Sequence, residues 1–117
     1  MSHSIFSELE MKDLSFATLD DFKNSAGLKV LFLWGYNCPN CEIAKTALSQ
    51  ELELIKKFEI AWYHCNVYED FDVSTHFGLH GIPVFLFYRG AKSLGRVTSF
   101  PGMDPFIEVL QKLTTNN

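Results

Sequence analysis

Residues 28–41 read LKVLFLWGYNCPNC, and this stretch decides how the chain of 117 residues is expected to fold. Up to Trp34 it is apolar except for Lys29, a pattern typical of a strand that is covered on both faces of a sheet. It ends in two cysteines, Cys38 and Cys41, and the apolar residues that follow recur at helical spacing. The sequence therefore predicts two thiols at the point where a buried strand leads into a helix.

This position gives the two thiols different expected roles. Pro39 suits the first position of a helix, which leaves Cys38 at the cap. The free backbone N–H groups and the dipole at a helix N-terminus stabilise an anion, so Cys38, as a thiolate, is the candidate nucleophile. Cys41 follows about one helical turn later, close enough to displace a group bound to Cys38 and to close a disulfide. The spacing favours reversible thiol–disulfide chemistry.

Residues on either side of the cysteines carry further patterns. Alternation over residues 14–18 predicts a short edge strand, and Asp20 and Asp21 begin a pattern that predicts a short helix ending at Gly27. From Pro39 a long amphipathic helix is expected. Its apolar face is expected to contain Ile43, Ala44, Ala47, Leu48, Leu52 and Ile55.

The second half of the chain continues the alternation of strands and helices. Residues 58–67 are typical of another buried strand, and residues 71–77 of a short helix stopped by Gly78. Residues 84–88 and 94–97 then predict two strands joined by a turn that contains glycine. The change from strand–helix units to a hairpin indicates a sheet that mixes parallel and antiparallel strands.

A last helix is predicted near the end of the chain, with Asp104 as its cap and Pro105 at its first position. Together the patterns predict an α/β fold in which a central mixed sheet of four to five strands has helices on both faces. No linker or internal repeat divides the chain. We therefore expect residues 1–117 to form a single domain, with its core at about residues 14–114.

Composition argues against several classes of function. The net charge is −4, and no Lys/Arg cluster is longer than Lys56-Lys57, so neither nucleic acid nor an anionic membrane is an expected partner. No apolar stretch approaches the roughly 20 residues that cross a bilayer. The first residues lack the pattern of a signal peptide, so a cytoplasmic protein is expected. An odd count of three cysteines fits a redox or metal protein better than a disulfide-stapled secreted one.

Several motifs in this order resemble the thioredoxin family. They are Trp34 four positions before Cys38, the Cys38 and Cys41 pair, the segment Gly81-Ile82-Pro83-Val84 at the head of a strand, and Gly102 before the last helix. A pair of cysteines with two residues between them is a weak signal alone. The resemblance covers roughly residues 18–113 and implies a thioredoxin fold.

The resemblance also implies roles for residues beside the cysteines. The Ile82–Pro83 bond is expected to be cis and to lie against Cys38, which an X-Pro bond permits at low energetic cost. The backbone of Ile82 is expected to pair with an extended segment of a protein substrate. Trp34 is expected to pack beneath the active-site turn, and Gly102 to leave room for the incoming chain, although ordinary packing and turn formation also explain both residues.

The chain departs from the usual thioredoxin pattern at several positions. Pro39-Asn40 replaces Gly-Pro between the cysteines, which alters the reduction potential in a direction that the sequence does not give. Asn37 replaces a tryptophan and removes apolar docking surface. Phe32 occupies the place of a buried aspartate that helps to deprotonate the second cysteine. His64 occupies the place of a nearby lysine and is a candidate general base, with a structural histidine as the alternative.

Cys65 follows His64 and is expected on the other face of the same strand, as an inert core residue. A metal site made of Cys38, Cys41, His64 and Cys65 has suitable ligand types. Opposite faces of one strand, however, do not easily aim two ligands at one ion. No metal is therefore expected.

These observations favour a thiol–disulfide oxidoreductase that reduces protein disulfides through Cys38 and Cys41. No bound organic cofactor is expected, and the redox-active group is the Cys38–Cys41 disulfide. The resemblance implies an electron-donating reductase, such as a flavin- and NADPH-dependent thioredoxin reductase, or another dedicated donor. Two alternatives remain open. One is a metal or iron–sulfur binding module that uses the cysteine pair, and the other is a redox-inactive interaction domain that holds a partner near Pro83.

Overall fold

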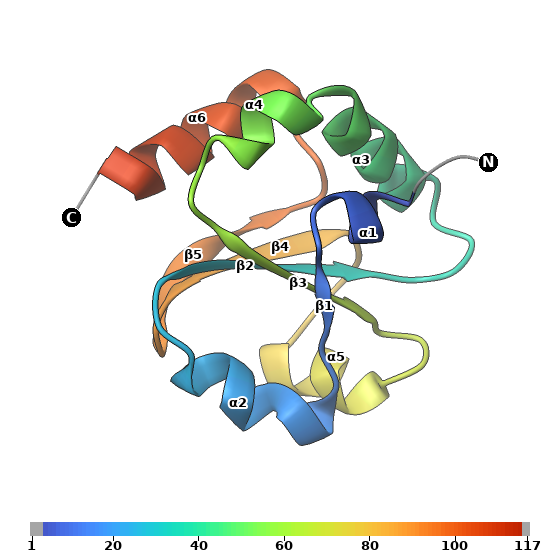
Figure 1. Cartoon of the computed structure of the whole chain (residues 1–117). Helices are drawn as coiled ribbons and strands as arrows, with labels where there is room; N and C mark the ends of the chain where they lie inside the picture. Colours follow the sequence, from blue (N-terminus) through green and yellow to red (C-terminus); the bar gives the residue numbers. More distant parts are fainter. Residues whose placement is uncertain (1–3, 116–117) are drawn as a thin grey trace.

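A single mixed sheet is the central layer of the computed structural model, which describes residues 4–115 (Figure 1). Its strands, in the order β1-β3-β2-β4-β5 across the sheet, are β1 (Lys12–Asp13), β2 (Leu28–Trp34), β3 (Ala61–Asn66), β4 (Val84–Arg89) and β5 (Lys92–Thr98). Strands β1, β3 and β2 run parallel, whereas β4 is antiparallel to both β2 and β5. The predicted mixed sheet is confirmed.

Helices cover both faces of this sheet, as predicted (Figure 1). One face carries α1 (Ile5–Glu8), α3 (Pro39–Gln50), α4 (Leu52–Lys56) and α6 (Met103–Thr115), and the other carries α2 (Leu19–Asn24) and α5 (Phe71–Phe77). A turn of 3-10 helix, η1 (Phe16–Thr18), precedes α2. No helix within residues 4–115 combines the length and apolar character that a membrane span requires.

Strand β2 separates two apolar cores, because its side chains alternate between the two faces of the sheet. Val30 and Phe32 belong to the core under α3 and α6, whereas Leu31 and Leu33 belong to the core over α2 and α5. All four side chains are fully buried. This is the arrangement that an uninterrupted apolar run predicts, and it fixes the end of β2 at Trp34, where the chain turns toward the cysteines.

Several predicted boundaries are also confirmed. Helix α5 ends at Phe77, and Gly78 follows in the left-handed conformation with φ of +62°. This conformation favours glycine because it has no Cβ. Strands β4 and β5 form the predicted hairpin, with Gly90 in its turn.

The predicted edge strand over residues 14–18 is wrong in position. The edge strand β1 is Lys12–Asp13, and Leu14 only continues its pairing with one hydrogen bond to the His64 carbonyl. Ser15 and Thr18 then hold each other's backbone in a capping box, which turns the chain into η1 instead of extending the strand. The alternation of apolar residues came from a turn that buries Leu14 and leaves Phe16 exposed.

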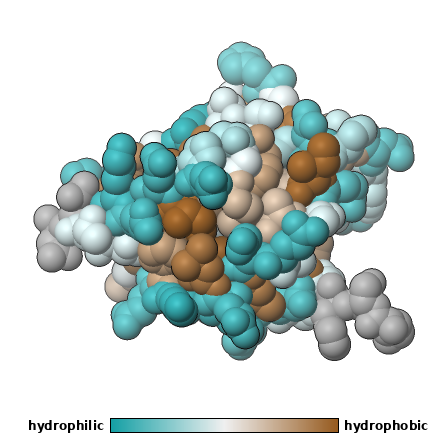
Figure 2. All heavy atoms as spheres, turned by 90° about the horizontal axis from the view of Figure 1, so that it is seen from above, coloured by the Kyte–Doolittle hydropathy of each residue, from teal (hydrophilic) through white to brown (hydrophobic). Residues whose placement is uncertain are grey.

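The predicted long helix is divided at Glu51, whose φ of −114° and ψ of +27° separate α3 from α4. Ile43 was expected on the apolar face but is 56% exposed, whereas Ala44 and Leu48 are fully buried. Four-residue spacing therefore defines the buried face, and Ile43 lies to one side of it. Figure 2 shows this helical face of the molecule, where hydrophobic side chains lie in patches among hydrophilic ones.

Two ends of the chain also differ from the sequence predictions. The last helix begins at Met103, so Asp104 and Pro105 lie inside its first turn and Asp104 is not the cap. Near the start, helix α1 was not predicted, because its four residues are too few to show a period. Its N-cap is Ser4, whose side chain accepts a hydrogen bond from the Phe6 N–H.

Candidate functional site

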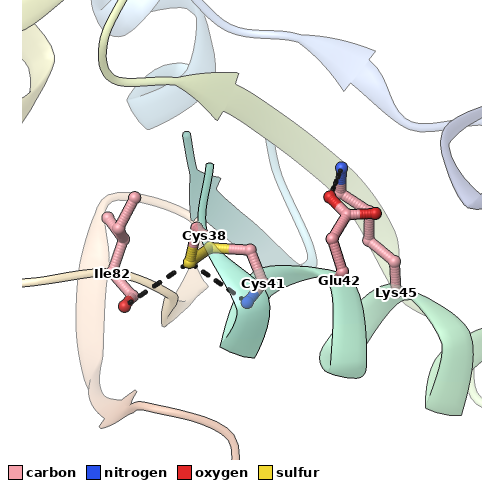
Figure 3. Close-up of a disulfide and its surroundings, with 5 residues drawn as sticks. All are labelled: Cys38, Cys41, Glu42, Lys45 and Ile82. Carbon is pink, nitrogen blue, oxygen red and sulfur yellow. Dashed lines mark hydrogen bonds and ion pairs between the residues drawn. A yellow bond between two sulfur atoms is a disulfide. The ribbon is translucent and has the colours of Figure 1, made fainter. Parts of the chain in front are cut away.

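Cys38 and Cys41 are joined by a disulfide at the start of α3 (Figure 3). Cys38 is the N-cap of this helix and Pro39 its first residue, as the sequence predicts. The Cα atoms of the two cysteines are 5.2 Å apart, and the Cys41 N–H donates a hydrogen bond of 3.1 Å to Cys38 Sγ. The sulfur of Cys38 therefore faces the positive end of a twelve-residue helix and one of its free amide donors.

The two sulfurs differ in accessibility. Cys38 is half-buried, whereas Cys41, the third residue of α3, is 0% exposed. Pro39 and Asn40, between them, are exposed. A large reactant can therefore approach the pair only from the side of Cys38.

The loop before β4 lies against the disulfide. The Ile82–Pro83 peptide bond is cis, which confirms the expectation drawn from the resemblance. The carbonyl oxygen of Ile82 is 3.9 Å from Cys38 Sγ (Figure 3). Pro83 is buried, and beside it a groove of about 380 Å³ extends over the ends of β4 and β5. The groove is lined by His80, Gly81, Ile82, Pro83, Val84, Arg96, Thr98 and Ser99.

The loop that carries the chain from β2 to Cys38 is tightly held. A Cβ at Gly35 would lie 2.7 Å from two ring carbons of Tyr68 and 2.8 Å from Cδ1 of Ile82. Only glycine fits between these side chains. Asn37 is exposed, with φ of +52°, a left-handed conformation that asparagine tolerates better than most residues. The sequence suggests only that Asn37 removes apolar docking surface. The structure shows that Asn37 also supplies the left-handed residue of the loop before Cys38.

Trp34 is half-buried beside the site and is contacted from several elements. Its indole Nε1–H donates a hydrogen bond of 3.2 Å to His64 Nδ1. Lys45 Nζ lies over the indole ring at 4.1 Å from its centroid, and it also pairs with Glu42 at 2.9 Å. Phe6 of α1 completes the cluster, at 5.1 Å between ring centroids. Trp34 therefore holds α1, α3 and β3 together next to the disulfide.

The structure shows how His64 is used. Its ring stacks on Phe6 at 4.0 Å, and burial lowers the pKa of the imidazole. The Trp34 bond occupies the lone pair of Nδ1, so the neutral ring carries its proton on Nε2. Neither cysteine is among its hydrogen-bonding or stacking partners in the described part of the chain. Acceptance of a proton from Cys41 would require the Trp34 bond to break, and a base role stays a prediction.

The space between the sheet and α3 is apolar. Phe32 is fully buried and stacks on Phe85, with ring centroids 4.8 Å apart. Ala44, on the inner side of α3, is also fully buried in this core. Phe32, which stands where the sequence resemblance expects a buried acid, therefore carries no charge in this apolar core.

Cys65 lies in the core on the opposite face of the sheet from the disulfide, as predicted. Burial, together with the charge of nearby carboxylates such as Asp70, raises the pKa of its thiol to about 12. Within residues 4–115, no three His, Cys, Asp or Glu side chains are grouped as a metal site would need. His64 and Cys65 point to different cores, which agrees with the argument from strand alternation.

Gly102 precedes α6, with φ of +100°, and its carbonyl accepts a hydrogen bond from the Phe106 N–H. A Cβ there would meet only Pro105 Cδ, at 4.0 Å, within the described residues. The conformation therefore explains this glycine without reference to a ligand. Its role in leaving room for a substrate stays a prediction.

Comparison with known proteins identifies the fold. No family model and no curated protein matches the chain. One solved structure, described as the structural basis of the thiol resolving mechanism in yeast mitochondrial 1-Cys peroxiredoxin via glutathione/thioredoxin systems, aligns with a TM-score of 0.78 over 94% of this chain and 99% of that chain.

The chain has a thioredoxin fold. The sequence resemblance is confirmed at this level. The two proteins share 12% sequence identity, so the similarity establishes the fold and leaves the activity to the site. In all, 345 solved chains match.

Two features of this thioredoxin fold were not found from the sequence. Tyr36 donates a hydrogen bond to Glu69, which lies after β3, and the Tyr68 ring packs on Gly35. These contacts join residues more than 30 positions apart. The available signal was the run Tyr68-Glu69-Asp70-Phe71-Asp72, which places aromatic residues between acids at the end of a predicted strand.

Proposed function

We propose that this protein is a thiol–disulfide oxidoreductase that reduces protein disulfides by exchange with Cys38 and Cys41. The observation that carries the proposal is the difference between the two sulfurs. Cys38 is accessible, caps α3 and lies beside the Ile82 carbonyl, whereas Cys41 is fully buried next to it. One sulfur is placed to meet a large substrate, and the other to react only with the first.

In the reduced protein the Cys38 thiolate begins the reaction. The Cys41 N–H and the positive end of α3 stabilise its charge. The thiolate attacks one sulfur of the substrate disulfide, and a bond forms between Cys38 Sγ and that sulfur as the substrate S–S bond breaks. The second substrate sulfur leaves as a thiolate and takes a proton from water.

Cys41 completes the exchange. Its thiol loses a proton to solvent and attacks Cys38 Sγ, which forms the disulfide and releases the first substrate sulfur as a thiolate. The cysteine pair has then given two electrons to the substrate. Cys41 is fully buried, so water reaches its thiol less easily than that of Cys38, and this second step is expected to be the slower one.

Proteins are the proposed substrates because the site is open and partly built from backbone. The Ile82 carbonyl and the groove beside Pro83 offer an extended chain a hydrogen-bonding edge next to Cys38. Each turnover leaves the pair oxidised, so an external dithiol or reductase must supply two electrons. An NADPH-dependent thioredoxin reductase is the proposed donor, on the sequence resemblance alone.

Trapping of the mixed disulfide tests this proposal. The Cys41→Ser variant, reduced and then mixed with oxidised insulin, is expected to accumulate an adduct on Cys38 that mass spectrometry locates. The Cys38→Ser variant is expected to form none, because its remaining active-site thiol is buried. Equal adducts in both variants, or none in either while circular dichroism shows both folded, would contradict the proposal.

A further inference from the structure

Residues 67–72, which form the loop between β3 and α5 and the start of α5, expose large aromatic side chains. Tyr68 is 48% exposed and Phe71 is 66% exposed, and their ring centroids are 6.4 Å apart. Tyr36, on the loop that leads to Cys38, is 51% exposed. Exposed single apolar residues are ordinary, but three aromatic rings at the edge of one site form a surface that a partner can cover.

This surface is continuous with the disulfide. The Tyr68 ring and the Ile82 side chain both lie within 3 Å of the point where a Gly35 Cβ would be. The Ile82 carbonyl in turn lies 3.9 Å from Cys38 Sγ. A chain that pairs with the Ile82 backbone therefore reaches Tyr68 directly, and Phe71 beyond it.

The same segment is acidic. Glu69 and Asp72 are exposed, and Glu69 also accepts the hydrogen bond from Tyr36. Asp70 is already used, because its carboxylate accepts a hydrogen bond of 2.8 Å from the Phe16 N–H. Residues 58–88 contain four acids and neither Lys nor Arg. The negative charge of the loop is therefore not neutralised by its own segment of chain.

Two cations on neighbouring elements, Lys45 and Arg96, make their contacts away from this segment. Lys45 lies over the Trp34 ring and pairs with Glu42 on its own helix. Arg96 donates a hydrogen bond to the Phe77 carbonyl, at the opposite end of α5 from Phe71. Among the described residues neither Glu69 nor Asp72 has an ion-pair partner, and both are exposed beside the aromatic rings.

The loop is held in place before any partner arrives. The Asn66 side-chain oxygen accepts a hydrogen bond of 3.0 Å from the Tyr68 N–H, and the Asn66 carbonyl accepts one of 3.0 Å from the Glu69 N–H. Asn66 itself is buried at the end of β3. A preformed surface loses little conformational entropy on binding.

We propose that Tyr68, Glu69, Phe71 and Asp72 form a docking rim that selects protein substrates with a Lys or Arg close to the reactive cysteine. This inference rests on the proposed function. The substrate chain lies along Ile82, and its basic side chain passes over the aromatic rings and meets the two carboxylates. A cation is favoured twice at this rim, by the ring faces and by the negative charge.

Peptide reduction measures this selection. Three peptides, each with one intramolecular disulfide, would carry Arg, Ala or Glu at the positions that flank the first cysteine. The wild-type protein is expected to reduce the Arg peptide about tenfold more efficiently, in kcat/KM, than the Ala peptide. The Glu peptide is expected to be the slowest, and salt is expected to narrow the differences.

Variants of the docking rim then test whether its residues cause the preference for the Arg peptide. Glu69→Gln with Asp72→Asn is expected to reduce the ratio of Arg to Ala peptide to below about threefold, and Phe71→Ala to lower it independently. The matched control is Glu53→Gln with Glu108→Gln, which removes two exposed carboxylates from α4 and α6 and is expected to keep the full ratio. An equal ratio in rim and control variants would overturn the inference, as would a wild-type protein without preference.

A binding measurement separates this inference from the proposed function. The Arg peptide with serine in place of both cysteines would be titrated into the oxidised protein, and the amide shifts of residues 66–72 followed by NMR. Shifts confined to this loop and residues near Ile82 support the docking rim even if no peptide is reduced, in which case the proposed function alone fails. No shift with the Arg peptide would overturn the docking rim whatever the activity.

Discussion

Trp34 and His64 are joined by a hydrogen bond of 3.2 Å from the indole Nε1–H to the imidazole Nδ1, between neighbouring parallel strands. The bond requires a neutral His64 that carries its proton on Nε2. It lies next to the chain that leads into the disulfide, so the charge of this histidine affects both the fold and the site. His64 therefore has a structural role, as the acceptor of the Trp34 hydrogen bond and as the stacking partner of Phe6.

Stability is predicted to fall at mildly acid pH because of His64. Burial lowers the pKa of His64 below its ordinary value of 6.5, so the unfolded chain binds this proton more readily than the folded one. The stabilising effect of the neutral form is complete above pH 6.5 and is lost as pH falls from there through the lowered folded pKa. Urea denaturation between pH 7.5 and 5 is expected to show a steeper loss of stability in the wild type than in His64→Gln.

His76, which is exposed, supplies the control for that measurement. The His76→Gln variant is expected to retain the slope of the wild type. If the wild type and His64→Gln lose stability in parallel as the pH falls, His64 is not the group that titrates.

Cys65 is predicted to be unreactive in the folded protein. With a thiol pKa of about 12, on the order of one thiol in 10⁵ is ionised at pH 7, and the side chain is buried as well. Native reduced protein treated with iodoacetamide is expected to be modified first at Cys38, and at Cys65 only after denaturation. Peptide mapping by mass spectrometry checks the order, and early modification of Cys65 would show that its core opens readily.

Gly35 is predicted to be intolerant of any side chain. Gly35→Ala is expected to destabilise the protein by about 1–3 kcal/mol, because its Cβ would lie 2.7 Å from the Tyr68 ring and 2.8 Å from Ile82 Cδ1. Displacement of Ile82 is also expected to slow the reduction of insulin.

Gly81→Ala is the matched control for Gly35→Ala, because a Cβ at Gly81 meets no described atom within 4 Å and its φ is not positive. Its stability is expected to stay within about 0.5 kcal/mol of the wild type. Denaturation curves measure both effects, and equal stability of the two variants would contradict the close packing around Gly35.

Phe32→Asp is predicted to be severely destabilising, although the sequence resemblance expects an acid at this position. Phe32 is fully buried against Phe85, so the new carboxylate would be buried without a partner. Its charge must be removed by protonation for the chain to fold, and the variant is expected to be less unstable at pH 4 than at pH 7. Phe32→Leu, which keeps the site apolar, is expected to lose only about 1–2 kcal/mol and to keep its activity.

Much of the fold was predictable because strong local patterns define it. The apolar run of β2 predicted a strand buried on both faces, and its alternation divides Val30 from Leu31 between the two cores. Pro39 predicted the start of α3 by its missing N–H. The place of Ile82 and Pro83 beside Cys38 followed from motif resemblance, since no local pattern brings residues so distant in sequence together.

The rest depends on contacts that a sequence does not display. Phe6, in a four-residue helix, stacks on His64, which follows 58 positions later in a strand. No pattern in either segment predicts this contact. The separation of α3 from α4 at Glu51 replaces one regular pattern with two short ones. Tyr68 packs on Gly35 from a loop 33 positions later, and no local pattern predicts that contact.

The measurement that tests the central claim most directly is the redox equilibrium of Cys38 and Cys41 in glutathione buffers, followed by alkylation and mass spectrometry. A protein-disulfide reductase is expected to form the Cys38–Cys41 disulfide reversibly. Its reduction potential is expected to be strongly reducing, at about −270 mV. Cys38→Ser and Cys41→Ser are expected to form no such bond. A potential as oxidising as about −120 mV would contradict the proposed direction, and no disulfide at any buffer ratio would contradict the account itself.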